Sequence, residues 1–266
     1  MQRKSSISLG AIYYWWLVAV LFAPIFLLII FSFNNSTQLV FPFKGFTLQW
    51  YAKLLESREM LEAVRTSVFL GIGSSLLSTS LGALGAIAIT RFKFAGKGAF
   101  TAVAAMPLVI PYIILGVSLL IMFNEVGIHL SAWAAGLAHV VISLPYALLI
   151  ITSRLVGFPA NLEEAAMDLG ASYWGALMRV TIPICSPALV AAFLICFTIS
   201  FDEFAIASFL VGTQPTLPVY LYSQLRFPTR LPLVVSLAAI LMVVSMIVVL
   251  LSEWLRRIGQ EPSQRS

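Results

Sequence analysis

The sequence predicts an all-α integral membrane protein with six transmembrane helices and a helix-turn-helix loop on the cytoplasmic side. Hydrophobic residues make up 60% of the chain and charged residues only 10%. Apolar runs long enough to cross a bilayer recur along the whole sequence. A long polar break interrupts its second half at 154–185. These observations predict a single transmembrane domain over 1–266.

The expected spans are continuously apolar, which indicates helices, because lipid offers no partner for unpaired backbone groups. A membrane barrel would instead show short strands of alternating polarity. The first run follows Arg3 and Lys4, as a secretory signal does. Its apolar core is longer than that of a signal and no A-x-A-like site follows, so we expect a retained helix. The spans lie at about 15–31, 67–90, 100–123, 130–152, 187–210 and 233–254.

Basic residues in short loops predict the orientation. The loop after the third span, 124–129, has no Lys or Arg, whereas the loop after the second span and the C-terminal tail are basic. Both termini and the 154–185 loop are therefore expected in the cytoplasm, and the net charge of +5 indicates topology rather than nucleic-acid binding. The basic residues are Arg91, Lys93, Lys97, Arg256, Arg257 and Arg265.

Local patterns add further expectations. In the long outer loop, Thr47 can cap a helix over 48–56 whose face bears Leu48, Tyr51, Leu54 and Leu55. Trp50 and Tyr51 would anchor that helix at the membrane interface, although a soluble partner could also dock there. Small residues at every fourth position of the second span predict close helix packing, and prolines in the third and fourth spans predict kinks. These residues are Ser74, Ser78, Gly82, Pro107, Pro111 and Pro145.

The polar break itself predicts two helices joined by a turn. Asn161 is a good N-cap with Glu164 three residues later, as in a capping box. Gly170 suits a positive φ at the end of the first helix. Ser172 can cap a second helix through Val180, which Pro183 is expected to end before the fifth span begins.

So short a unit needs a surface against which to bury its apolar side chains. A soluble partner with a hydrophobic groove is one explanation, and an amphipathic hairpin on the lipid surface is the other. The side chains expected to be exposed are Ala165, Ala166, Met167, Tyr173, Trp174 and Leu177.

The residues Glu164-Ala165-Ala166-Met167-Asp168-Leu169-Gly170, followed by Val180-Thr181-Ile182-Pro183, are similar to the E-A-A-x3-G-x9-I-x-L-P loop of permease subunits of bacterial ABC importers. The resemblance implies that this loop couples the membrane subunit to an ATPase. The implied coupling residues are Glu164, Ala165, Ala166, Asp168, Gly170, Ile182 and Pro183.

The chain is expected not to be an enzyme. No G-x-x-x-x-G-K-[ST] motif occurs, so ATP and Mg²⁺ are expected in the partner ATPase and no cofactor in this chain. No metal-ligand cluster is visible, and Cys185 and Cys196 are interpreted as packing residues of the fifth span.

Ionisable residues within spans are candidates for a transport pathway. Asp202 and Glu203 are neighbours, so their side chains point about 100° apart on a helix, and we expect at least one to line a cavity that attracts cations. A salt bridge with Arg226 or Arg230, or exposure near the outer surface, is the structural alternative. Ser200 and Tyr112 are further pathway candidates, and His139 is expected to be a packed core histidine.

A narrower resemblance covers nearly the whole chain. The runs Ser200-Phe201-Asp202-Glu203-Phe204, Thr216-Leu217-Pro218 and Gly45-Phe46-Thr47-Leu48-Gln49-Trp50-Tyr51 are similar to spermidine/putrescine permeases of the second-subunit type. The resemblance implies a bacterial inner-membrane location and polyamine cargo. It also implies a second permease, an ATPase dimer and a periplasmic solute-binding protein as partners. The run 226–235 departs from that family's glycine and Asn-Ala pair, which leaves opines and amino-acid derivatives open as substrates.

Two other functions stay open from sequence. A proton-driven secondary transporter would use Asp202, Glu203 and His139, but it leaves the Glu164 loop unexplained and no inverted repeat is visible. A membrane scaffold without transport would tolerate neutralisation of both carboxylates.

Overall fold

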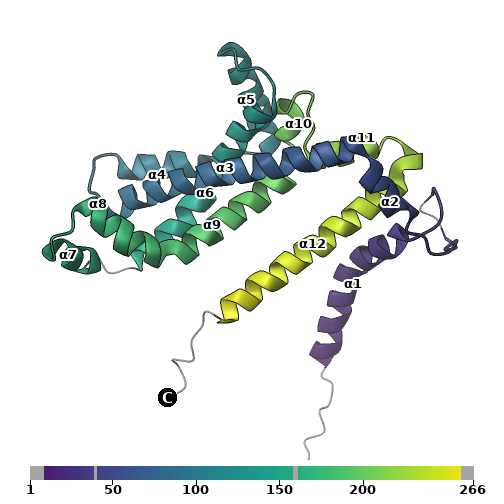
Figure 1. Ribbon diagram of the computed structural model, residues 1–266, viewed down its shortest axis with the longest axis horizontal. Coiled ribbons are helices and arrows are strands. Elements are labelled where there is room, and N and C mark those ends of the chain that lie inside the picture. Colours follow the sequence, from purple (N-terminus) through teal and green to yellow (C-terminus); the bar gives the residue numbers. More distant parts are fainter. Residues whose placement is uncertain (1–8, 39–40, 158–160, 259–266) are drawn as a thin grey trace, which may run out of the picture. The chain divides into compact units, whose positions relative to one another are not determined.

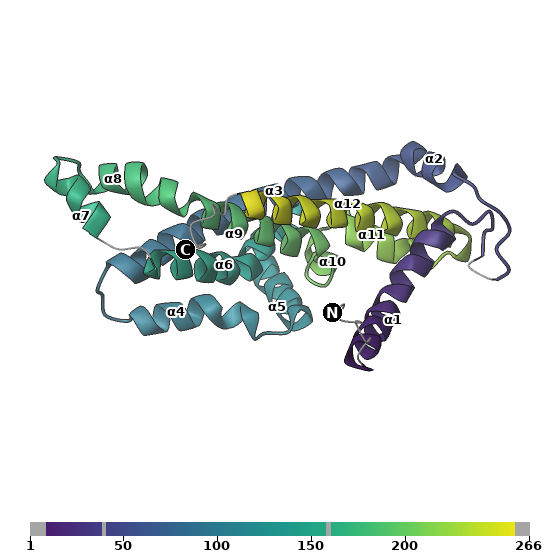
Figure 2. The same cartoon turned by 90° about the horizontal axis from the view of Figure 1, so that it is seen from below.

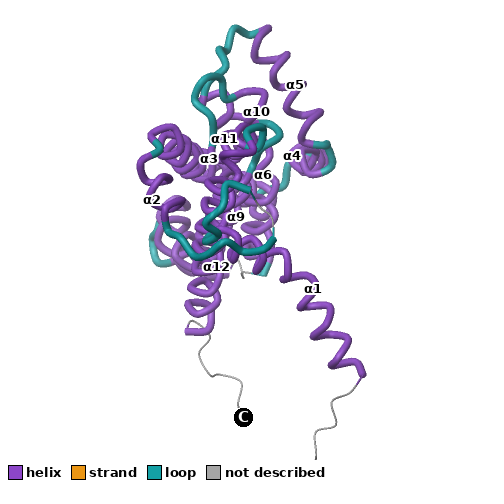
Figure 3. Tube along the Cα trace, turned by 90° about the vertical axis from the view of Figure 1, so that its right-hand side faces the viewer, coloured by secondary structure: helices purple, strands orange, loops and turns teal. Residues whose placement is uncertain are grey.

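The computed structural model describes residues 9–38, 41–157 and 161–258. Within them the chain consists of helices and loops, with one isolated bridge between Asn34 and Phe46 and no strand (Figure 3). The basic residues Arg3, Lys4 and Arg265 lie outside the described residues. Contacts divide the chain into two compact units, 1–58 with 221–266 and 59–220, and each is described by itself.

The first unit contains α1 (Leu9–Ser32), α2 (Gln49–Glu56), η3 (Pro228–Arg230) and α12 (Leu231–Ile258). α1 and α12 pack together, and the Ser236 hydroxyl donates to the Ser32 carbonyl at 3.1 Å. The Ser32 hydroxyl also lies 2.6 Å from the Tyr51 hydroxyl, which joins α2 to the end of α1.

α2 confirms the expected short helix but not its orientation. Leu48 and Leu55 are exposed, whereas Trp50 is buried and its indole N–H donates to the Asn34 carbonyl at 2.8 Å. Trp50 is therefore a core residue of this unit, and the interfacial-anchor interpretation of it is wrong. The cap position is Leu48 rather than Thr47, whose hydroxyl instead accepts from the Gln49 N–H.

The second unit is built around α3 (Arg58–Arg91), α6 (Ala132–Val156) and α9 (Ile182–Asp202), which run side by side (Figures 1 and 2). Small side chains allow the close approach of α3 to α6: a Cβ placed on Gly82 would lie 2.6 Å from that of Ala147. Ser74 and Ser78 are buried on the same stripe, so the packing role predicted for these small residues is confirmed.

The expected third span is broken. It consists of α4 (Lys97–Ala105), η1 (Met106–Leu108) and α5 (Tyr112–Glu125), and the chain bends by 107° between the two halves. Pro107 lies in η1 and Pro111 caps α5. The two prolines that predicted a kink therefore lie on either side of the bend. Pro145, by contrast, lies inside a continuous α6.

The expected fifth span is displaced toward the N-terminus. A continuous helical stretch runs from Tyr173 to Asp202, and the chain then breaks before the short α10 (Ala207–Leu210) and α11 (Leu217–Gln224). Among the described residues, four helices are long and apolar enough to cross a membrane, or five if the bent pair counts as one span. By length and hydropathy the described helices therefore do not reach the predicted count of six spans. α12, at the position of the expected sixth span, has 28 residues but is not among the helices counted.

Candidate functional site

The predicted helix-turn-helix lies at one end of the second unit (Figure 1). α7 (Asn161–Asp168) ends in a turn at Gly170, whose φ is +92°. The N–H groups of Gly170 and Ala171 donate to the carbonyls of Met167 and Ala166, which closes the turn. A glycine is needed because side-chain-bearing residues rarely adopt this φ. The positive φ predicted for Gly170 is thus confirmed.

The second helix of this unit also begins as expected. Ser172 is the N-cap of α8 (Tyr173–Ala176), and its hydroxyl accepts from the Gly175 N–H at 3.1 Å. The predicted end at Pro183, however, is wrong. α8 passes through a π-helical turn, η2 (Leu177–Thr181), directly into α9, and Pro183 lies in the first positions of α9. Its missing N–H is tolerated there because the π turn has already interrupted the regular bond ladder.

The unit exposes an apolar surface. Leu169 is 90% exposed and Trp174 63% exposed, and Leu162, Met167 and Met178 are exposed as well. Leu177, which was expected on this surface, is buried. Glu164, Ala165 and Asp168 are exposed, and Ala166 is half-buried. We call α7, α8 and η2 with the turn between them (161–181) the coupling unit. Its apolar surface consists of Leu162, Met167, Leu169, Trp174 and Met178.

The buried residue of α7, whose residues are all described, is Glu163. Its carboxylate lies 3.0 Å from Arg91 Nε, and it accepts a 2.7 Å hydrogen bond from the Thr181 hydroxyl. Arg91 is the last residue of α3, and Thr181 is the last residue of η2. The sequence did not predict this contact, since the motif begins one residue later, at Glu164.

The loop after α3 lies beside the coupling unit. In addition to the Arg91–Glu163 pair, the rings of Phe92 and Tyr173 meet edge to face with centroids 6.0 Å apart. Both loops therefore lie at the same end of the second unit. The distribution of basic residues predicts the same side of the membrane for both loops, and this contact agrees with that prediction.

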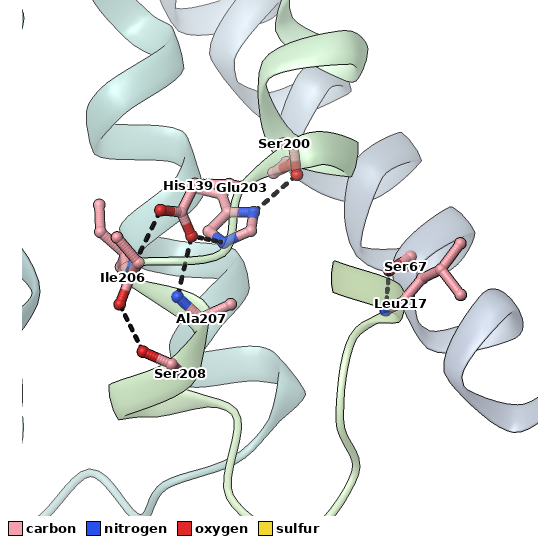
Figure 4. Close-up of polar contacts among 10 residues, drawn as sticks. Ser67, His139, Ser200, Glu203, Ile206, Ala207, Ser208 and Leu217 are labelled. Carbon is pink, nitrogen blue, oxygen red and sulfur yellow. Dashed lines mark hydrogen bonds and ion pairs between the residues drawn. The ribbon is translucent and has the colours of Figure 1, made fainter. Parts of the chain in front are cut away.

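A buried polar network lies at the far end of α9 (Figure 4). His139 of α6 is fully buried, and its Nδ1 lies 2.7 Å from the Ser200 hydroxyl. Ser200 in turn accepts a 2.9 Å hydrogen bond from Ser74 of α3. The network joins three long helices, and it confirms the core role predicted for His139.

Glu203 lies where α9 ends, and its carboxylate is bound on several sides. Its two oxygens accept the N–H groups of Ile206 and Ala207 at 2.8 and 2.9 Å, and Oε2 lies 3.4 Å from His139 Nε2 (Figure 4). Breaking a helix leaves backbone donors unpaired, which is costly without water. Glu203 pairs two of these donors and so stabilises the break between α9 and α10.

The other pathway candidates are divided between core and surface. Asp202 is exposed although Glu203 beside it is buried, which confirms that the neighbours point different ways. Tyr112 is half-buried and packs against the apolar cluster that includes Ile206. The structure thus brings Tyr112, Ser200 and Glu203 into the core around the helix break and leaves Asp202 outside it.

Residues with metal-binding chemistry form no cluster here. Within the described part of the chain, no group of three or more His, Cys, Asp or Glu residues is placed to hold a metal ion. Cys185 and Cys196 are buried in α9, and the Cys196 thiol contacts the Ser143 carbonyl at 3.4 Å.

The long apolar helices define a multi-pass membrane protein. Its helix-turn-helix exposes apolar side chains that a partner protein could cover. The chain belongs to the family described as the binding-protein-dependent transport system inner membrane component, whose model matches residues 78–258. It is the permease subunit of an ABC importer and a component of the inner membrane.

Curated relatives share most of the chain. It is 34% identical over 240 residues to the spermidine/putrescine transport system permease protein PotC of Escherichia coli (strain K12), covering 90% of each chain. It is 36% identical over 215 residues to the putrescine transport system permease protein PotI of the same organism, covering 77% of this chain and 76% of the relative.

A solved structure supports the fold. A chain of a bacterial ABC transporter involved in the import of the polysaccharide alginate superposes with a TM-score of 0.73. The alignment covers 98% of this chain and 99% of the other, at 15% sequence identity. At this identity the similarity concerns the fold alone.

Proposed function

We propose that this permease subunit forms half of a translocation pathway for a polyamine such as putrescine or spermidine, driven by a separate ATPase dimer. The observation that carries the proposal is the likeness to PotC over 90% of both chains. The other half would come from a second permease, and a periplasmic binding protein would deliver the cargo. The family's description as binding-protein-dependent supports the last point.

The coupling unit is the proposed contact with the ATPase. Its exposed apolar surface, with Leu169 and Trp174 the most exposed among the large side chains of α7 to α8, needs a partner to cover it. The motif residues Glu164, Ala165, Ala166, Asp168 and Gly170 lie on this unit, and Ile182 and Pro183 begin the membrane helix that follows it. We place the unit, and both termini, on the cytoplasmic side, in a protein of six spans that itself binds no ATP.

The proposed pathway residues are Asp202, Tyr112, Ser200 and Glu203. Asp202 is the strongest of them, because the residue is exposed and is the last of α9, adjacent to the helix break. Phe193, Phe197 and Phe201 form a row of stacked rings along α9 that ends one residue before Asp202, with centroids 6.5 and 5.6 Å apart. Aromatic faces and a carboxylate are suited to an organic ammonium ion. Glu203, already paired with His139 and two N–H groups, would act by holding the break.

The test is uptake of labelled putrescine and spermidine into proteoliposomes that contain the whole complex and the binding protein. Uptake that needs ATP and the binding protein is the expected result. ATP hydrolysis stimulated by the binding protein without polyamine uptake would refute the cargo and shift attention to opines or amino-acid derivatives. Uptake without ATP would refute the coupling assignment and favour a proton-driven transporter.

A further inference from the structure

The attachment of α7 to the membrane helices depends on a polar contact. The large apolar side chains of α7, Leu162 and Met167, are exposed, and so is Leu169 directly after it, whereas Glu163 is only 7% exposed. A helix of eight residues is not stable alone in water, so its position must be fixed by neighbours. Since the large apolar side chains of α7 point outward, Glu163 provides its buried side-chain contact with the rest of the second unit.

The partners of Glu163 come from two different long helices. Arg91 Nε lies 3.0 and 3.1 Å from the two carboxylate oxygens at the end of α3. The Thr181 hydroxyl donates to Oε1 at 2.7 Å from the turn that leads into α9. Hydrogen bonds to a charged carboxylate are shorter and stronger than neutral ones. Glu163 is thus bound to both helices at once.

We propose that Glu163 is a positioning residue for energy coupling. Held by Arg91 and Thr181, it joins α7 to the cytoplasmic ends of α3 and α9, so that a displacement of α7 by the ATPase moves both helices as one body. The inference rests on the proposed function and goes beyond it by naming the connection inside this chain. We call Glu163, Arg91 and Thr181 the α7 clamp.

The competing explanation is that the α7 clamp only stabilises the fold. A purely structural clamp predicts that its loss lowers the yield of assembled complex, while each complex that does assemble transports normally. A coupling clamp predicts assembled complexes that still hydrolyse ATP but import less substrate for each ATP. The ratio of putrescine imported to ATP hydrolysed separates the two explanations.

The experiment compares variants in the complete complex in proteoliposomes, with binding protein and labelled putrescine. Glu163→Gln keeps the shape and removes the charge, and Thr181→Val removes one donor while leaving the ion pair. We expect the import-to-hydrolysis ratio to fall about tenfold in Glu163→Gln and by a smaller factor in Thr181→Val, as expected for losing charged hydrogen bonds. Glu125→Gln, at the exposed end of α5, is the matched control and should keep the wild-type ratio.

Charge exchange provides the rescue. The double variant Arg91→Glu with Glu163→Arg should recover more of the ratio than either single variant, because the ion pair is restored with its direction reversed. An unchanged ratio in Glu163→Gln would overturn the inference while leaving the transport function intact. Failure of both Glu163→Gln and Thr181→Val to assemble would overturn it in favour of the structural explanation. Absence of ATP-driven uptake by the wild-type complex would refute the proposed function itself.

Discussion

The Nε2 atom of His139 lies 3.4 Å from Oε2 of Glu203, and both side chains are buried at the break between α9 and α10. The carboxylate also accepts the N–H groups of Ile206 and Ala207 in the next segment. An acidic residue near a membrane span therefore has a structural explanation as well as a transport one. Its neighbour Asp202 is exposed, and the contacts of the described residues include no comparable set of hydrogen bonds to its carboxylate.

Removing the Glu203 carboxylate should lower the stability of the permease, whereas neutralising Asp202 should lower transport instead. Glu203→Ala leaves two backbone donors and His139 without their acceptor, which should destabilise the protein by about 3–5 kcal/mol, the cost of breaking a buried pair. The purified permease complex should therefore unfold at a clearly lower temperature in detergent. Asp202→Asn should leave that temperature unchanged and reduce uptake of a cationic substrate.

Each half of this prediction has its own refutation. Normal thermal stability of Glu203→Ala would show that the helix break does not depend on the carboxylate. Wild-type uptake kinetics in Asp202→Asn would remove Asp202 from the pathway. Glu203→Asp, which keeps the charge on a shorter chain, should be intermediate in stability.

The α3–α6 contact predicts a sharp contrast between two glycines of one helix. A Cβ on Gly82 would lie 2.6 Å from Ala147 Cβ, whereas one on Gly73 would meet nothing within 4 Å. Gly82→Val should force the helices apart and destabilise the permease by about 1–3 kcal/mol, the usual cost of overpacking. Gly73→Ala should be tolerated. Folded yield and thermal unfolding in detergent measure both.

A compensating change tests the cause. Ala147→Gly opens space opposite Gly82 and should restore part of the stability of a Gly82→Ala variant. If it restores none, the cost arises from the backbone atoms Leu148 N and Ala147 C, which would lie 3.0 and 3.1 Å from the added Cβ and which the change leaves in place.

Much of this architecture could be predicted from the sequence because it depends on local patterns. Continuous apolar runs predicted the long helices, and Gly170 and Ser172 predicted the turn and cap of the coupling unit. These features depend on a few consecutive residues. The small-residue stripe on α3 was predictable for the same reason.

Features set by distant residues were not predictable. Glu163 is 72 residues from Arg91, and nothing in either segment indicates the pairing. Trp50 resembled an interfacial anchor because its acceptor, the Asn34 carbonyl, is a backbone atom that sequence does not reveal. The two prolines predicted a kink, but the 107° bend between α4 and α5 depends on how each half packs.

The turn at Gly170 should be sensitive to backbone conformation rather than to size. A Cβ there would meet nothing within 4 Å, but φ is +92°. Gly170→Val should cost roughly 1–2 kcal/mol locally and redirect α8, since non-glycine residues avoid left-handed conformations. Import per ATP should fall while membrane insertion continues. Gly170→Asn, which tolerates positive φ better, should keep more of the coupling than Gly170→Val.

An equal loss of import per ATP in the two Gly170 variants would indicate that the ATPase contact tolerates no side chain at this position. Normal transport in Gly170→Val would refute the coupling assignment of the turn.

The apolar surface of the coupling unit predicts the strength of ATPase binding. Leu169 is 90% exposed at the tip of the turn and contributes little to the packing of this chain. If a partner buries it, Leu169→Asp removes apolar contact and places a charge in the interface, a change that costs about 2 kcal/mol or more at a hot spot. Because this side chain is outside the core, the permease itself should fold normally.

Copurification of the ATPase subunit with the tagged permease measures this effect, and thermal unfolding of the permease serves as the internal control. We expect the bound ATPase to fall by about tenfold or more, since each 1.4 kcal/mol is a factor of ten in affinity. Val126→Asp, on an exposed apolar residue at the end of α5, is the matched control for adding a charge and should retain the ATPase. Equal ATPase retention in Leu169→Asp and Val126→Asp would show that the exposed tip does not contact the motor, and the amphipathic lipid-surface interpretation would then explain Leu169 and Trp174 better.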